Sequence, residues 1–256
     1  MADWDGAGYA HISSLQRTMA EYSLAAVHVR GDERVLDVGC GDGFVTRSIA
    51  ARLPHGAVLG VDPSPRMIET AIAARESDGN VSFAVDDLTT MNFVGEFDLV
   101  VSFNALHWVR AQEIAYRNIS NALMPTGRAL LQFVCAGDRP SVEQVSMDVT
   151  TDSRWSAAFD GFTAPFVHID PASLEATASA AGLKVIDCAV VDREWDFGSR
   201  EAFAEWCTVG SSDWTARLDA AQVPDFVDEV VSRYAAIVGK PGVFRFMQLR
   251  AELAQA

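Results

Sequence analysis

The stretch Arg34-Val-Leu-Asp-Val-Gly-Cys-Gly-Asp-Gly-Phe44 decides the fold of this chain. Residues 35–38 form the short, mainly apolar run of a strand that is covered on both faces. Residues 44–53 carry apolar side chains at helical spacing, which predicts a helix packed on that strand. The glycines between strand and helix supply backbone angles that other residues resist, and they allow a ligand to lie directly against the main chain.

The glycines are Gly39, Gly41 and Gly43, and Asp37 precedes the first of them by two positions. The dinucleotide fingerprint Gly-x-Gly-x-x-Gly would require glycine at position 44, where Phe44 stands. Because pyrophosphate needs an open helix start, an acidic strand end beside this turn suits a cationic ligand better. A tight structural turn and another nucleotide fold are the alternatives.

This stretch resembles motif I of the class I S-adenosylmethionine-dependent methyltransferases, whose pattern is Asp/Glu-x-Gly-x-Gly-x-Gly. Asp37, Gly39, Gly41 and Gly43 match its four defined positions, and Cys40 lies between them. The resemblance implies a doubly wound, Rossmann-like α/β sheet of seven strands in the order 3-2-1-4-5-7-6, with the last strand antiparallel and with helical lid insertions. It also implies S-adenosyl-L-methionine as the cofactor, S-adenosyl-L-homocysteine as its product, and no metal.

A second strand, residues 57–61, ends on Asp62. A ribose diol offers two hydroxyl donors, and a carboxylate at a strand end can accept both. Asp62 is therefore a candidate for the ribose, and Pro63 and Met67 of the following turn and helix are candidates for the same site. A solvent-exposed turn aspartate is the alternative.

A third strand, residues 80–85, ends on Asp86-Asp87-Leu88. A carboxylate here can accept a proton of the adenine amino group, while the Leu88 amide can donate to a ring nitrogen. The resemblance gives Asp87 the adenine role, with Asp86 less favoured. Either carboxylate could instead cap the turn that follows.

A fourth strand, residues 97–103, is followed by Asn104-Ala-Leu-His-Trp-Val109. This segment resembles that of small-molecule carboxyl methyltransferases of the trans-aconitate and juvenile-hormone-acid types, and of the malonyl-carrier-protein methyltransferase. The resemblance implies that Asn104 lies beneath the methionine part of the cofactor and that His107 and Trp108 face the substrate as catalytic residues. A histidine bonded within the turn and a tryptophan packed in the core are the alternatives.

A helix predicted over residues 13–29 precedes the sheet. In the family that this chain resembles, such a helix folds across the cofactor and closes off the substrate, which makes Gln16 a cofactor-binding candidate. Trp4, Tyr9 and His11 are then candidates for the substrate wall. Packing of these aromatic side chains onto the domain is the alternative.

We expect one methyltransferase domain over residues 1–256, with a helical cover at 1–30 and a cofactor-binding core at 31–134. Lid insertions follow at 135–170 and 198–240, and the remaining helix and edge strands at 171–197 and 241–256. Further helices are predicted over 110–123 and 171–181, and further strands over 128–134, 184–191 and 242–249. The insertions are rich in Trp and Phe, which indicates a largely apolar acceptor contacting Trp155, Phe162 and Trp206. An ordinary lid core is the alternative.

The composition restricts the partners. The chain has 256 residues, is 49% hydrophobic and carries a formal charge of −15, which disfavours nucleic acid and favours a small molecule. No run approaches membrane-spanning length and no secretory signal is present, so we expect a cytoplasmic monomer or homodimer with no membrane partner. The four cysteines lie far apart and indicate neither a zinc site nor a disulfide framework.

Methyl transfer from a sulfonium mainly requires alignment and exclusion of water. A carboxylate acceptor titrates near ~4 and needs no general base, whereas a hydroxyl or amine would require one, such as His107. A tricarboxylate would need several cations, for which Arg17, Arg139, Arg154, Arg193 and Arg245 are available. A small organic acid, fatty or isoprenoid, is therefore preferred. N-, C- or hydroxyl-O-methylation, a nicotinamide-dependent oxidoreductase and a non-catalytic cofactor-binding protein are the alternatives.

Overall fold

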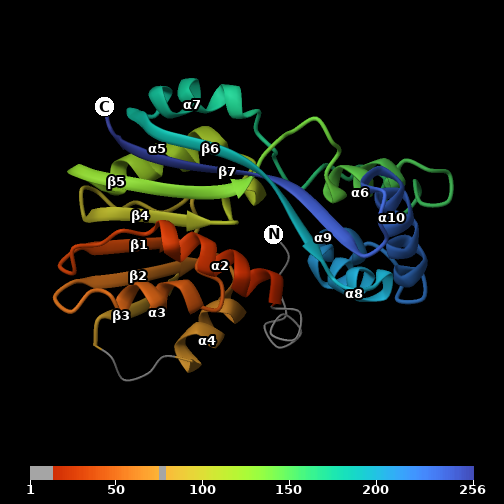
Figure 1. Ribbon diagram of the computed structural model, residues 1–256, viewed down its shortest axis with the longest axis horizontal. Coiled ribbons are helices and arrows are strands. Elements are labelled where there is room, and N and C mark those ends of the chain that lie inside the picture. The colour runs from red at the N-terminus through yellow and green to blue at the C-terminus, as the bar shows by residue number, and fades with distance from the viewer. Residues whose placement is uncertain (1–13, 75–78) are drawn as a thin grey trace.

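The computed structural model describes residues 14–74 and 79–256, and its centre is a seven-stranded sheet (Figure 1). The strand order is β3-β2-β1-β4-β5-β7-β6, which confirms the predicted topology. Strands β1 to β5 run parallel, and β7 is antiparallel to both of its neighbours. The strands are β1 (Arg34–Val38), β2 (Ala57–Asp62), β3 (Val81–Val85), β4 (Phe97–Phe103), β5 (Leu123–Val134), β6 (Leu183–Asp196) and β7 (Val243–Gln255).

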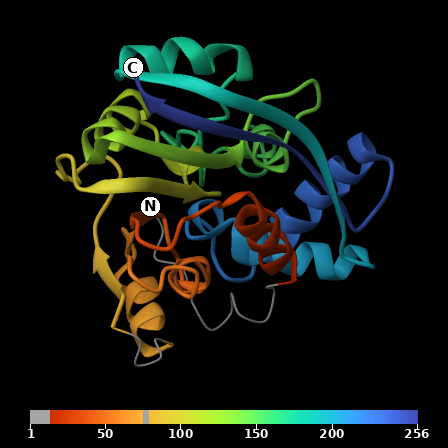
Figure 2. The same cartoon turned by 60° about the vertical axis from the view of Figure 1, so that its left-hand side comes forward.

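Helices cover both faces of the sheet and form a lid beyond one end of it (Figures 1 and 2). The helices of the sheet region are α2 (Ser14–Ala26), α3 (Phe44–Ala50), α4 (Pro65–Ala73), η1 (Leu106–Trp108), α5 (Gln112–Ala122), η2 (Pro171–Ser173) and α7 (Leu174–Ala180). The lid contains α6 (Val142–Thr150), α8 (Arg200–Gly210), α9 (Ser212–Thr215) and α10 (Val223–Val238). No helix of the described ranges 14–74 and 79–256 has both the length and the apolar character needed to cross a membrane.

Parallel pairing brings the carboxyl ends of the first four strands to one edge. Val38 at the end of β1 pairs with Val61 of β2, and Asp62 at the end of β2 pairs with Val85 of β3. On the other side, Asp37 of β1 pairs with Val101 of β4. The segments that follow these strands therefore meet at the same edge, where ligands of open α/β sheets bind.

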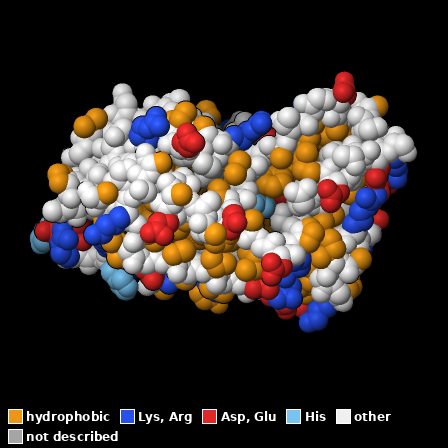
Figure 3. Space-filling view, turned by 90° about the horizontal axis from the view of Figure 1, so that it is seen from above, with side chains coloured by type: hydrophobic (Ala, Val, Ile, Leu, Met, Phe, Trp, Pro, Cys, Tyr) orange, Lys and Arg blue, Asp and Glu red, His pale blue; other side chains and the backbone are white. Residues whose placement is uncertain are grey.

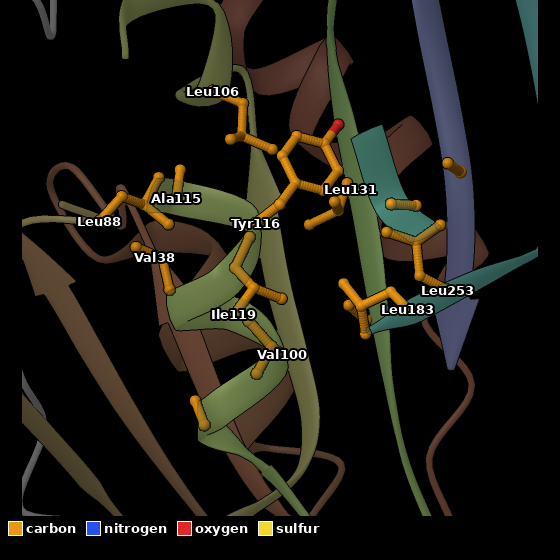
Figure 4. Close-up of a cluster of buried hydrophobic side chains, with 14 of the residues drawn as sticks. Val38, Leu88, Val100, Leu106, Ala115, Tyr116, Ile119, Leu131, Leu183 and Leu253 are labelled. Atoms are coloured by element: carbon orange, nitrogen blue, oxygen red, sulfur yellow. The ribbon is translucent and has the colours of Figure 1, made fainter. Parts of the chain in front are cut away.

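Two apolar layers hold the sheet between its helices. On one face, α5 and α7 pack over side chains of the central strands, and the fully buried ring of Tyr116 lies beside Leu106 and Leu131 (Figure 4). On the other face, α2 and α3 bury side chains that include Leu24 and Ile49. Both faces of the β1 strand are thus covered, as its nearly unbroken apolar run predicts.

The lid has its own aromatic core, built on the outer half of the β6–β7 ribbon. β5 pairs with β7 only as far as Gln248, whereas β6 follows β7 out to Val243. The aromatic side chains packed on this ribbon and the lid helices include Trp155, Phe203, Trp214, Phe226, Tyr234, Phe244 and Phe246. Leu15 and Met19 of α2 join the same cluster, so the first described helix bridges the sheet and the lid.

Three strands are longer than their patterns predict. β5 begins at Leu123 rather than 128, because Leu123 pairs with Phe97 across an irregularity in the ladder, and α5 therefore ends at Ala122. β6 and β7 extend beyond 184–191 and 242–249 because each is the partner of the other. Their polar residues hide the strand pattern, since one side of β6 is exposed along most of its length.

Candidate active site

Glycine is needed at the three positions after β1 for different structural reasons. All three have positive φ angles, from 54° to 77°. A Cβ on Gly39 would lie 2.2 Å from Cβ of Ala105, and one on Gly43 would lie 2.6 Å from Cζ of Phe83. A Cβ on Gly41 would meet nothing within 4 Å, and Gly41 borders the large groove described below. Gly39 and Gly43 therefore permit close packing, whereas Gly41 leaves a bare stretch of main chain facing the groove.

Most amides of this loop already have hydrogen-bond acceptors. The N–H groups of Gly39 and Cys40 both donate to the Val61 carbonyl, at 2.8 and 3.0 Å. Gly41 donates to Oδ2 of Asp62 at 3.0 Å, and Phe44 donates to Oδ1 of Asp42 at 3.0 Å. A pyrophosphate binds such a loop through free amides at the helix start. This arrangement offers carboxylate oxygens instead, which agrees with the expectation of a cationic ligand.

Asp37 is a buried carboxyl at the end of β1. It is 2% exposed, and its Oδ2 accepts a 2.6 Å hydrogen bond from Oγ1 of Thr46. Burial raises the pKa of Asp37 to about 7, with the Thr46 bond lowering it and the nearby Asp62 raising it. Asp37 therefore changes its charge close to neutral pH, unlike an ordinary aspartate.

Asp62 organises the loops after β1 and β2 together. Its Oδ2 accepts from the Gly41 amide and its Oδ1 accepts from the Ser64 amide at 2.9 Å. Burial raises the pKa of Asp62, although these two amides lower it. A carboxylate has about four acceptor sites, so two remain for the hydroxyls of a ribose. Pro63 and Met67 border the same groove.

The turn after β3 separates its two aspartates. Asp87 and Leu88 border the groove, and Oδ1 of Asp87 accepts from the Thr89 amide at 2.7 Å. Asp86 is not among the groove residues, and its Oδ1 accepts from the Asp87 amide at 2.8 Å. The preference for Asp87 as the adenine partner therefore agrees with the geometry and remains a proposal.

These strand ends enclose a groove of about 850 Å³. That volume lies within the usual range for cofactor and drug-sized ligands. The sequence-predicted cofactor residues that border it are Gln16, Asp37, Gly39, Cys40, Gly41, Asp62, Pro63, Met67, Asp87, Leu88 and Asn104. Five aspartates and four arginines border the groove, and the three aspartates at the strand ends, with the bare surface of Gly41, suit the donor groups of an adenosyl ligand.

Beyond the groove lies a smaller chamber of about 140 Å³, between α2, η1, the lid helices and β7. Gln16, Asn104 and Trp108 border both spaces, so the groove and the chamber meet at these side chains. Asn104 has a φ of 57°, and its amide donates to the Gln132 carbonyl at 2.7 Å, which fixes this junction. Hydrophobic side chains also gather on the surface where the sheet and the lid meet (Figure 3).

His107 lies in the wall of the chamber and is held in one orientation. Its Nδ1 accepts from the Val134 amide at 3.4 Å, and its carbonyl accepts from the Val167 amide at 2.8 Å. Burial, with a smaller effect of His168, lowers the pKa of His107 to about 3. The imidazole is therefore neutral at neutral pH and is a weak proton acceptor there.

The predicted substrate residues have different locations. Trp206 borders the chamber, and Phe162 borders the groove. Trp155 is 1% exposed, borders neither space, and donates its indole N–H to Glu229 at 2.8 Å. The remaining three, Trp4, Tyr9 and His11, lie outside the described residues.

Several chamber residues were not predicted from the sequence. Met19, Glu143, Trp214, Phe244 and Phe246 all border it. They come from four elements that are far apart in the chain, and none lies at a strand end or in a recognisable motif. Only the aromatic enrichment of the insertions pointed towards part of this set.

Comparisons with known proteins agree with this geometry. Residues 35–127 match the family model described as a methyltransferase domain. Juvenile hormone acid O-methyltransferase of Bombyx mori is 36% identical over 170 residues, covering 62% of this chain and 60% of that enzyme. Trans-aconitate 2-methyltransferase of Methylobacterium nodulans is 33% identical over 141 residues, covering 55% of this chain and 54% of that enzyme. The matched part therefore spans less than two thirds of either relative.

The fold has solved counterparts as well. A phosphoethanolamine N-methyltransferase 2 of Haemonchus contortus, in complex with S-adenosylhomocysteine, aligns with a TM-score of 0.62 at 19% identity. The alignment covers 97% of this chain and 57% of that one. The strand order and the acidic glycine loop are those of the class I S-adenosylmethionine-dependent methyltransferases, and residues 35–127 carry the matched methyltransferase domain. Within that class, the chain is similar to the small-molecule carboxyl methyltransferases of the two types named above.

Proposed function

We propose that this protein transfers a methyl group from S-adenosylmethionine to a small, largely apolar molecule held in the chamber. The observation that carries the proposal is the junction at Gln16, Asn104 and Trp108, where an adenosyl-sized groove with carboxylates meets an apolar chamber. A cofactor lying in the groove would direct its reactive end towards that junction. S-adenosylmethionine supplies a methyl carbon bonded to a positively charged sulfur.

The chain's own contribution is positioning. Asp62 would accept the ribose hydroxyls with the two acceptor sites that its amide bonds leave, and Asp87 would accept from the adenine amino group. The Trp108 ring at the junction provides an electron-rich face for a cation. The aromatic lid excludes water from the chamber, which favours in-line displacement over hydrolysis.

A tricarboxylate acceptor, which the name of the bacterial relative would suggest, has little support in this chain. Arg139 and Arg245 both pair with Asp192, and Arg154 pairs with Asp225. Arg193 stacks on the ring of Tyr22 at 4.6 Å. Arg17 alone among the five predicted arginines borders the groove. These five arginines are therefore dispersed rather than gathered around one anion.

The oxidoreductase alternative has weaker support than methyl transfer. In the loop that would bind pyrophosphate, most amides are bonded to acceptors of Val61, Cys40, Asp62 and Asp42. A non-catalytic cofactor-binding protein would share the groove but would not transfer the methyl group.

The proposal is tested by mass spectrometry of a metabolite extract incubated with the protein and methyl-labelled S-adenosylmethionine. We expect labelled small molecules that form with wild type and are lost in Asp62→Ala. Titration calorimetry with S-adenosylhomocysteine independently measures ligand binding in the groove. Binding without any labelled product would support the non-catalytic alternative, and absence of binding at millimolar ligand would contradict the proposal.

A further inference from the structure

The chamber has an unusual charge for an enzyme that resembles carboxyl methyltransferases. Among the described residues that border it, Glu143 is the only charged side chain. The others are apolar, aromatic or neutral polar groups, and no Lys or Arg is among them. An acidic acceptor would therefore meet a like charge in an apolar space, with no cation of the described part of the wall to offset it.

The Glu143 carboxylate lies in the first turn of α6, a position that favours negative charge. Its Oε2 is inaccessible to solvent and receives no hydrogen bond from the described residues. Nε2 of His168 lies 4.0 Å away, which is beyond hydrogen-bond distance, and it too has no such partner in the described chain. Because a buried carboxylate oxygen without a donor is costly, a ligand that brings a donor removes this cost once the Glu143 side chain turns Oε2 towards the chamber.

The neighbours of Glu143 do not neutralise it. Burial lowers the pKa of His168, with Glu143 opposing the shift, and it lowers the pKa of His107 to about 3. The His168 ring lies 4.6 Å from Phe166 and 6.1 Å from His107, between centroids. Burial therefore favours the neutral form of both imidazoles, and neither brings a positive charge to Glu143 near pH 7.

A second unpaired group lies in the same wall. The indole Nε1 of Trp214 is buried without a hydrogen-bond partner in the described residues, and Trp214 borders the chamber. The chamber thus offers one strong acceptor and one neutral donor within a mainly apolar surface. Its volume of about 140 Å³ is close to that of an engineered cavity that accepts benzene, so one ring fills it.

On the basis of the proposed function, we propose that the acceptor is a hydroxyl or amine on a small ring-sized apolar body, whose hydrogen Glu143 accepts. A carboxylate acceptor, which the sequence analysis preferred, is disfavoured by the same residue. Glu143 then acts as a catalytic residue for this acceptor, and Trp214 is positioned to donate to a second polar atom of the ligand.

A lone pair of the acceptor oxygen or nitrogen forms the bond to the methyl carbon, and the carbon–sulfur bond breaks with its electron pair remaining on sulfur. The hydrogen of the acceptor group passes as a proton to the Glu143 carboxylate. The positive charge of the sulfonium and the negative charge of Glu143 are both removed, and a methyl ether or methylamine leaves.

Three probes with one skeleton separate the acceptor classes, namely benzyl alcohol, benzylamine and benzoate. Each is titrated by calorimetry into the protein saturated with S-adenosylhomocysteine. We expect the alcohol or the amine to bind at least about tenfold more tightly than benzoate. Tighter binding of benzoate, equal binding of the three, or no binding of any at millimolar concentration would overturn the inference.

Glu143→Gln tests the residue itself, because it keeps the size of the side chain and removes its charge. We expect this variant to lose the preference against benzoate and to keep its affinity for S-adenosylhomocysteine. Glu205→Gln removes the same charge from an exposed position of α8 and should retain the wild-type preference. A preference unchanged in Glu143→Gln would overturn the inference, whereas failure of wild type to bind S-adenosylhomocysteine would overturn the proposed function instead.

Discussion

Asp62→Ala is the substitution with the most direct consequence for cofactor binding. In the structure the carboxylate accepts one amide on each oxygen, from Gly41 at 3.0 Å and from Ser64 at 2.9 Å. The two acceptor sites that remain are those assigned to the ribose hydroxyls. Hydrogen bonds to a charged group contribute about 1.5–3 kcal/mol each, so losing both should cost about 3–6 kcal/mol. The dissociation constant for S-adenosylhomocysteine should then rise on the order of 10²- to 10⁴-fold.

Calorimetric titration with S-adenosylhomocysteine measures this change, and thermal unfolding reports whether the fold is kept. Loss of the two amide bonds should lower the melting temperature only modestly, because removing Asp62 also removes a like charge beside buried Asp37. Asp86→Ala is the matched control, since Asp86 adjoins the groove residues without bordering the groove. An Asp62→Ala protein that melts normally and binds with wild-type affinity would refute the assignment of the ribose site.

Four other substitutions separate binding, protonation and packing. Gly41→Ala should lower the free energy of unfolding by only about 1–2 kcal/mol but weaken cofactor binding measurably. Gly43→Ala should lower the free energy of unfolding by more, because its Cβ would lie 2.6 Å from a phenylalanine ring. Because the pKa of Asp37 is raised to about 7, binding of a cation should release the proton of this carboxyl. The affinity for S-adenosylmethionine should therefore rise from pH 6 to pH 8. Calorimetry in two buffers should detect the proton release, and Asp37→Asn should abolish it. Trp155→Phe should lower stability by roughly 1–3 kcal/mol in thermal unfolding and leave methyl transfer unchanged, because its indole bond lies outside both cavities.

The cofactor half of the site could be predicted from the sequence because it depends on local order. A parallel strand ends where its apolar run ends, and the next residues then lie at one edge of the sheet. Asp37, Asp62 and Asp87 could therefore be assigned to a single groove before their distances were known. The reason for each glycine could not be predicted, since Gly39 and Gly43 pack against Ala105 and Phe83.

The acceptor half could not be predicted in the same way. Glu143 lies in the first turn of a helix in one insertion, His168 lies in the loop that follows, and Trp214 belongs to the other insertion. Their proximity depends on how far the β6–β7 ribbon extends past Gln248, and the polar residues of those strands hide that length. The expectation of a carboxylate acceptor came from resemblance in the cofactor half, which does not determine the charge of the chamber.

A crystal structure of the protein with S-adenosylhomocysteine tests the central claim most directly. We expect the ribose hydroxyls within hydrogen-bond distance of Asp62, the chain of the ligand passing over Gly41, and its sulfur at the junction beside Trp108. Density for the ligand elsewhere, or a groove between Asp37 and Asp87 left empty at saturating ligand, would contradict the account.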